Sequence, residues 1–150
     1  MTSILFRCDA SLLIGSGHVM RCRNLARELQ RRGATVTFLC LRQPGDLISL
    51  LEQEFPVLAL PEQPLAACEG LEGRDLYGAW LGCSQATDAA QCLEALARAG
   101  ITSSSWLVAD HYGLDANWET QLLAGLAGGA APPKLLVIDD LADRSHQADL

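Results

Sequence analysis

The stretch "ILFRCDASLLIGSGHVMRCRNLARELQRRG", residues 4–33, contains a strand, a loop and a helix in succession. Its first five residues form a short apolar run that is typical of a buried strand. From Val19 onwards, apolar residues recur at helical spacing, and Gly33 supplies the stop. A strand, a glycine-bearing loop and a helix together predict the first part of a βαβ unit, and therefore an α/β fold.

The same alternation continues along the chain. We expect further strands at residues 35–41, 57–60, 106–110 and 134–140, and helices at residues 46–55, 87–100 and 116–126. Residues 62–83 are less regular and predict a loop-rich excursion, and "AGGAAPP", residues 127–133, predicts a turn-rich connection. Strands that alternate with helices indicate a Rossmann-like parallel sheet with helices on both faces.

Helix caps and core residues follow from the same pattern. Thr87 or Asp88 is the expected cap of the helix that ends near Gly100, and Asp115 is the expected cap of the next helix. Trp118 is expected in the core.

Length and charge limit the possible classes of protein. The 150 residues fit one domain, and 49% apolar with 19% charged residues argues against disorder. The net charge of −7 argues against a general nucleic-acid binder, which needs a basic face. A local basic pocket for an anionic metabolite stays possible, because Arg7, Arg21 and Arg23 lie near the glycine loop.

The cysteines and the apolar runs predict a location. No two of the six cysteines form a CxxC pair, so we interpret them as small buried hydrophobic residues in a reducing cytosol. The sequence does not begin like a secretory signal, and no apolar stretch is long enough to span a bilayer. We therefore predict a soluble cytoplasmic protein that does not associate with membranes.

Three polar stretches follow predicted strands. They are residues 9–18, 110–115 and 139–146, and each carries a histidine. Ligands of parallel α/β sheets bind beyond the carboxyl ends of the strands. We therefore expect these three stretches to form one rim around the site.

The glycine loop is a weak phosphate motif but places a histidine well. "GSGHVM" has Met20 where a dinucleotide fingerprint needs its third glycine, and the Walker pattern is absent. His18 is expected at a helix N-terminus, where the helix dipole disfavours the protonated ring and favours a neutral general base. The alternative is that His18 merely helps to cap the helix. The glycines predict a turn with positive φ, which is also compatible with close approach of a substrate.

Other polar residues leave alternatives open. Asp110 could orient a catalytic group or simply end its strand, and Tyr112 could contact a sugar. Asp139 and Asp140 could suggest a metal pair, but adjacent strand residues point to opposite faces, so a turn or cap role is favoured. The sequence has no G-x-S-x-G elbow to support a hydrolase triad.

Three quoted segments together resemble one family. They are "FRCDASLLIGSGHVMRCRNLARELQRRG", "VADHYGLDANWE" and "LLVIDDLADRSHQADL". The chain resembles the UDP-2,4-diacetamido-2,4,6-trideoxy-β-L-altropyranose hydrolases of pseudaminic acid biosynthesis, with their spore-coat polysaccharide relatives. The resemblance covers the chain from end to end and is weakest in the loop-rich middle.

The resemblance implies a domain organisation. The family is similar in fold to two-domain GT-B glycosyltransferases, so residues 1–150 would be the amino-terminal Rossmann-like domain. The carboxyl-terminal domain, which makes most nucleotide contacts in the family, would then be missing from this chain. The chain also stops on a fresh apolar start, "HQADL", which predicts a longer protein.

The resemblance also implies a reaction and its residues. Water attacks the anomeric carbon of a UDP-sugar, UDP leaves and the configuration inverts, with His18 as general base. The substrate-binding residues that carry over are Asp9, Gly15, Gly17, Arg21, Asp110 and Tyr112. No metal and no cofactor are implied. Two alternatives stay open: a GT-B glycosyltransferase of cell-surface polysaccharide synthesis, and a non-catalytic domain that binds sugar nucleotides.

Overall fold

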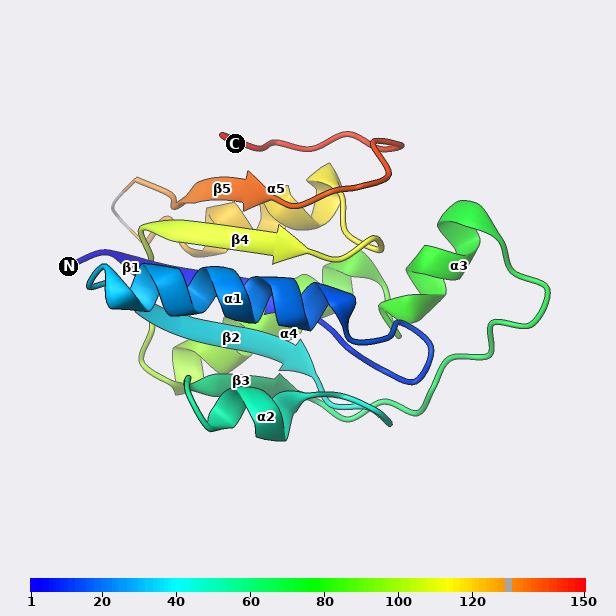
Figure 1. The fold of residues 1–150 in the computed structure, drawn as a ribbon. Helices are drawn as coiled ribbons and strands as arrows, with labels where there is room; N and C mark the ends of the chain where they lie inside the picture. Colours follow the sequence, from blue (N-terminus) through cyan, green and yellow to red (C-terminus); the bar gives the residue numbers. More distant parts are fainter. Residues whose placement is uncertain (129–130) are drawn as a thin grey trace.

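The computed structural model describes residues 1–128 and 131–150. Within them a parallel sheet of five strands has the order β3-β2-β1-β4-β5 (Figure 1). The strands are β1 (Ser3–Cys8), β2 (Thr35–Leu41), β3 (Val57–Leu60), β4 (Trp106–Asp110) and β5 (Lys134–Val137). This order, with β1 at the centre, confirms the Rossmann-like α/β fold.

Helices cover both faces of the sheet. They are α1 (Gly17–Arg31), α2 (Ile48–Glu52), α3 (Gly73–Trp80), α4 (Gln85–Arg98) and α5 (Ala116–Gly125). Figure 1 shows α1 and α2 on one face, α4 and α5 on the other, and α3 apart from both layers, beyond the strand arrowheads. Because crossovers between parallel strands are right-handed, the reversal of direction after β3 moves the connecting helices to the opposite face.

Alternate residues of each strand fill two separate cores. Ile4 and Phe6 pack into the cluster beneath α1 and α2, whereas Leu5 packs into the cluster with α4 and α5. Trp118 of α5 is fully buried in the second cluster, as predicted. Each fully buried Leu, Ile or Phe side chain contributes about 2 kcal/mol, so both helix layers are held firmly to the sheet.

Several predicted boundaries are wrong. The excursion at residues 62–83 contains α3, none of whose residues is buried. Helix α4 begins at Gln85 because the Ser84 side chain caps it by accepting from the Thr87 amide, and Asp88 is buried. Strand β5 ends at Val137, before the two aspartates.

Other local predictions have mixed outcomes. Asp115 caps α5 by accepting from the Asn117 amide, as predicted. Helix α1 begins two residues earlier than Val19, and α2 is shorter than residues 46–55. Of the predicted connection at residues 127–133, residues 129–130 lie outside the described part. Cys8, Cys22, Cys40 and Cys92 are buried thiols as expected, whereas Cys68 and Cys83 are only partly buried.

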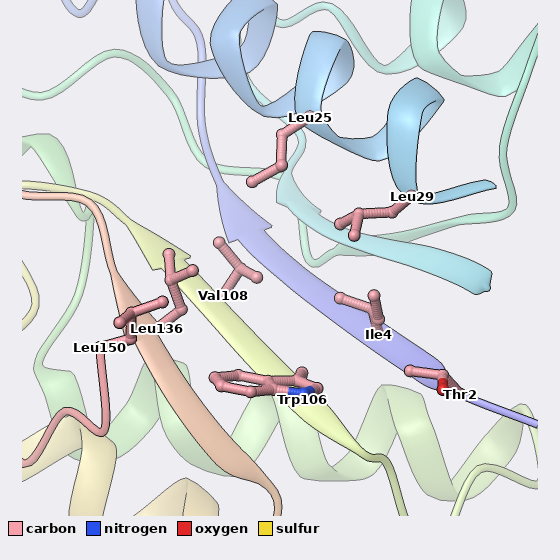
Figure 2. Close-up of a pocket in the computed structure, with 8 residues that line it drawn as sticks. All are labelled: Thr2, Ile4, Leu25, Leu29, Trp106, Val108, Leu136 and Leu150. Atoms are coloured by element: carbon pink, nitrogen blue, oxygen red, sulfur yellow. The ribbon is translucent and has the colours of Figure 1, made fainter. Parts of the chain in front are cut away.

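An apolar hollow of about 300 Å³ lies on the sheet face beside α1 (Figure 2). Its lining residues are Thr2, Ile4, Leu25, Leu29, Trp106, Val108, Leu136 and Leu150. Leu150 reaches it because the chain end pairs with the outer edge of β5, where the Val137 amide donates to the Leu150 carbonyl. In the part of the chain that the structure describes, no helix has the length and apolar character needed to cross a membrane.

Candidate active site

The site lies where β1 and β4, neighbours in the sheet, end at their carboxyl edge. The loop after β1 turns at Gly15, whose φ of +81° confirms the predicted turn. The Gly15 amide donates to the Ser11 carbonyl at 2.8 Å, and the Ser11 hydroxyl accepts from two further loop amides. A Cβ built at Gly15 or Gly17 meets no atom within 4 Å, so the described part of the protein leaves space beside both glycines. This turn delivers His18 into the first turn of α1.

His18 is bound to Asp110, the last residue of β4. The His18 Nδ1 lies 2.6 Å from Asp110 Oδ1, and the His18 side chain is 10% exposed. A carboxylate only accepts hydrogen bonds, so Nδ1 carries the proton and Nε2 keeps its lone pair. The orienting role of Asp110, one of two alternatives in the sequence, is the one that this geometry favours.

Arg21 sits one turn further along α1 and clamps the same carboxylate. Its Nε and Nη2 donate to the two oxygens of Asp110, each at 2.6 Å. Burial alone would raise the pKa of Asp110, but the hydrogen bonds from Arg21 and then from His18 outweigh it and lower that pKa. Asp110 therefore stays ionised, which keeps His18 in the tautomer with an accepting Nε2.

Tyr112 and Asp140 extend this network. Arg21 Nη1 donates to Asp140 Oδ2 at 2.6 Å, and the Tyr112 hydroxyl donates to the same oxygen at 2.8 Å. The Tyr112 ring stands edge-on to the His18 ring, with centroids 4.5 Å apart. Asp139 turns away and pairs with Arg144 instead, so the two aspartates do not serve one site.

Asp9 lies deeper than a surface pocket residue would. Its side chain is fully buried, and Oδ1 accepts from Arg7 at 2.6 Å and from the Leu41 amide at 2.7 Å. Burial would raise the pKa of Asp9, but Arg7 and His111 hold it well below its usual range. Asp9 thus ties β1 to β2 and also forms the floor of the site together with His111.

Helix α3 brings an aromatic wall that sequence reasoning missed. The Tyr77 ring stands edge-on to the Tyr112 ring and the Trp80 ring stacks against it, with centroids 5.2 and 6.3 Å away. Arg74 donates to the Tyr112 carbonyl and pairs with Asp143 at 3.2 Å. The aromatic run "YGAW" was the available signal. Asp9, Ile14, His18, Trp80, His111 and Tyr112 together line a small pocket.

Not every predicted rim residue joins the site. His146 lies between Glu119 and Asp139, 2.7 and 3.2 Å from them, and is absent from the lining of the small pocket. The local basic pocket that the sequence left possible does not form from Arg7, Arg21 and Arg23, because Arg7 is fully buried against Asp9 and Asp88, and Arg23 pairs with Glu54. Two of the three predicted stretches therefore supply lining residues of the pocket, and the third contributes Asp140 to the network beside it.

Comparisons with known proteins identify no family for this chain. No protein-family model matches the chain, and no curated protein matches it significantly. Among solved structures, the chain is similar to the crystal structure of Acinetobacter baumannii MurG, with 12% sequence identity and a TM-score of 0.47. The match covers 91% of this chain and 35% of that one, so the chain spans about a third of the length of that protein.

Proposed function

We propose that this chain carries the general base of an enzyme that cleaves a UDP-linked deoxy-diacetamido sugar with water. The observation that carries the proposal is the His18–Asp110–Arg21 arrangement, with a fully buried Asp110, at the carboxyl edge of a Rossmann-like sheet. In folds of this type, ligands bind at that edge. The resemblance in sequence supplies the substrate class.

The role of His18 as the base follows from which of its ring nitrogens carries the proton. Asp110 holds the proton on Nδ1 of His18, so Nε2 can accept a proton from a water molecule. When Nε2 takes that proton, the ring becomes an imidazolium beside an ionised carboxylate, which stabilises the new charge. A positioned base of this kind contributes on the order of 10²–10⁴ in rate.

The bonds change in one displacement. The water oxygen forms a bond to the anomeric carbon while the bond from that carbon to the phosphate oxygen breaks. UDP leaves with the electron pair, the proton from water stays on His18, and the anomeric configuration inverts. UDP is a good leaving group once its phosphates are stabilised, so the scheme includes no second strong acid.

The small pocket does not distinguish water from a sugar hydroxyl as the nucleophile. Trp80, Tyr112 and Ile14 close the space beside His18, and no room for a water-sized molecule is left inside it. Hydrolysis is favoured by the resemblance in sequence, and a glycosyltransferase of the same fold is the second candidate, because the same base can deprotonate a sugar hydroxyl.

The phosphates would bind to a second domain. Arg21, the arginine that contacts His18, is already shared between Asp110 and Asp140. The diphosphate therefore needs cationic or backbone groups from outside this cluster. We propose that a carboxyl-terminal nucleotide-binding domain supplies them and that residues 1–150 alone bind UDP poorly.

Product analysis on the full-length protein tests the proposal. UDP-2,4-diacetamido-2,4,6-trideoxy-β-L-altropyranose is incubated with the protein, and proton NMR follows UDP release and the configuration of the first-formed sugar. We expect free sugar of inverted configuration. His18→Gln should lose activity by about 10²–10⁴, and His146→Gln is the matched histidine control with near wild-type turnover.

The outcomes separate the candidates. A glycoside formed only when an acceptor sugar is added would favour the transferase. UDP-sugar binding without any UDP release would favour the non-catalytic domain. A folded His18→Gln variant with wild-type turnover would overturn the assignment of the base.

A further inference from the structure

Asp140, the second of the two aspartates that follow β5, joins the site through its side chain. Its Oδ2 accepts from Arg21 Nη1 at 2.6 Å and from the Tyr112 hydroxyl at 2.8 Å. The sequence favoured a turn or cap role for the two aspartates, and Asp139 has that role, because its Oδ1 accepts from the Leu141 amide at 3.0 Å. Asp140 therefore needs a separate explanation, which its charge provides.

The charge of Arg21 opposes the proposed chemistry. Its Nη2 lies 3.3 Å from His18 Nδ1. When His18 takes a proton from the nucleophile it becomes a cation, and two positive groups at this distance repel each other. Asp110 offers one negative charge, but both of its oxygens also accept from Arg21. A single carboxylate would thus have to balance two cations.

Asp140 supplies the second negative charge. The hydrogen bond from Arg21, and then the one from Tyr112, lower the pKa of Asp140, so its carboxyl group is ionised at neutral pH. The two carboxylates and the guanidinium then give the cluster a net charge of minus one while His18 is neutral. The net charge becomes zero when His18 accepts a proton.

We propose that Asp140 is a positioning residue that acts through Arg21, because it offsets the guanidinium charge and so lets His18 take up a proton. It also holds Nη1 of Arg21 while Nε and Nη2 contact Asp110, so all three nitrogens of the guanidinium are bound. This inference rests on the proposed function, in which His18 is the base.

Other titratable groups near the base do not supply this negative charge. They are Asp9, Cys22, His111 and Tyr112. The charge of Asp9 is paired with that of Arg7, and His111 is either neutral or cationic. The Tyr112 hydroxyl stays neutral because burial, and then its hydrogen bond to the nearby carboxylate, raise its pKa. A neighbouring thiol lowers the pKa of Cys22, but burial and the nearby carboxylate outweigh it, so Cys22 also stays neutral.

Titration of the His18 ring in the full-length protein tests this role without any substrate. Nitrogen-15 NMR follows the ring, and His18→Gln identifies its signals. Asp140→Asn keeps an accepting oxygen but loses the charge, so the midpoint of the His18 titration should fall. We expect a fall of roughly 0.5 pH unit, because the Asp140 side chain is 55% exposed and water screens its charge. Asp140→Glu keeps the charge and should move the midpoint less.

A substitution of opposite sign sharpens the test. Arg21→Gln removes the opposing cation, so the midpoint should rise by about one pH unit. The double variant of Arg21→Gln and Asp140→Asn should lie between the two single variants. Glu52→Gln removes one exposed negative charge from α2 and is the control for overall charge, with an unchanged midpoint. Under the proposed function, the acid limb of kcat/KM for UDP release should move with the midpoint.

The results distinguish two failures. A folded Asp140→Asn variant whose midpoint stays at or above the wild-type value overturns the role of Asp140, because a purely structural role would cost Tm or turnover without lowering the midpoint. A midpoint that falls in Arg21→Gln does the same. Wild-type protein that releases no UDP overturns the proposed function, whatever the titration shows.

Discussion

Replacing Asp110 with asparagine should disable His18 while leaving the fold in place. The carboxylate receives His18 Nδ1 and Arg21 Nη2 on Oδ1, and Arg21 Nε on Oδ2, all at 2.6 Å. Asparagine retains one accepting oxygen and puts an NH₂ group in the other position. With the NH₂ group at the Oδ1 position, His18 Nδ1 becomes an acceptor and Nε2 becomes protonated. When the NH₂ group takes the Oδ2 position instead, this donor faces the Nε–H donor of Arg21.

The contacts of Asp110 determine how much stability and how much activity the substitution should cost. Either orientation loses one charge-assisted hydrogen bond, worth about 1.5–3 kcal/mol. Arg21 is 34% exposed, so water replaces part of that bond and the lower half of this range is expected. About 2 kcal/mol corresponds to a fall in Tm of about 4–8 °C for a chain of this size. Activity should fall much further, by about 10²–10⁴, because the base loses the stabilising negative charge in both orientations and its tautomer in one of them.

Nitrogen-15 NMR of the His18 ring, together with kcat, checks this reasoning. Wild-type protein should show the proton on Nδ1, and Asp110→Asn should shift the ring toward the Nε2–H tautomer or a mixture. A purely structural role would change Tm without altering the ring signals. Asp110→Asn with unchanged kcat and unchanged ring nitrogen shifts would refute the positioning role.

Three further predictions concern stability and α3. Trp118→Phe should cost about 1–2 kcal/mol in urea unfolding, because it removes the buried Nε1–H bond of 2.9 Å to Asp88; an unchanged midpoint would contradict this. The pKa of Asp9 is lower in the folded than in the unfolded state, so its stabilisation is present above about pH 4 and is lost as pH falls below that value. Unfolding curves between pH 7 and pH 3 should show the loss, and a flat profile would argue against it. Arg74→Ala removes the pair with Asp143 and the bond to the Tyr112 carbonyl, so the amide hydrogens of α3 should exchange faster than in wild-type protein while those of α4 do not; unchanged exchange in α3 would show that the aromatic contacts suffice.

Much of the fold could be predicted because local pattern and tertiary packing agree. The runs at residues 4–8 and 106–110 are apolar because the strands they predict are covered on both faces. Helix α3 was missed because it is short and lies in an otherwise irregular stretch, although its apolar residues recur at helical spacing as strongly as those of α1. The cap at Ser84 was missed because Asp88, a good cap by type, is drawn into the core by Arg7 and Trp118.

For the site, the sequence predicted His18 and several of its neighbours but missed Tyr77 and Trp80, and only the tertiary structure decided how these side chains are arranged. The order of strand, glycine loop and helix placed His18 at a helix start, because turn and helix signals are local. Only the sheet order placed β4 beside β1 and brought Asp110, 92 positions away, to the His18 ring. Likewise, only packing revealed that Asp9 and His111 are neighbours. Distances between side chains depend on how strands pair, and one sequence without its fold does not contain them.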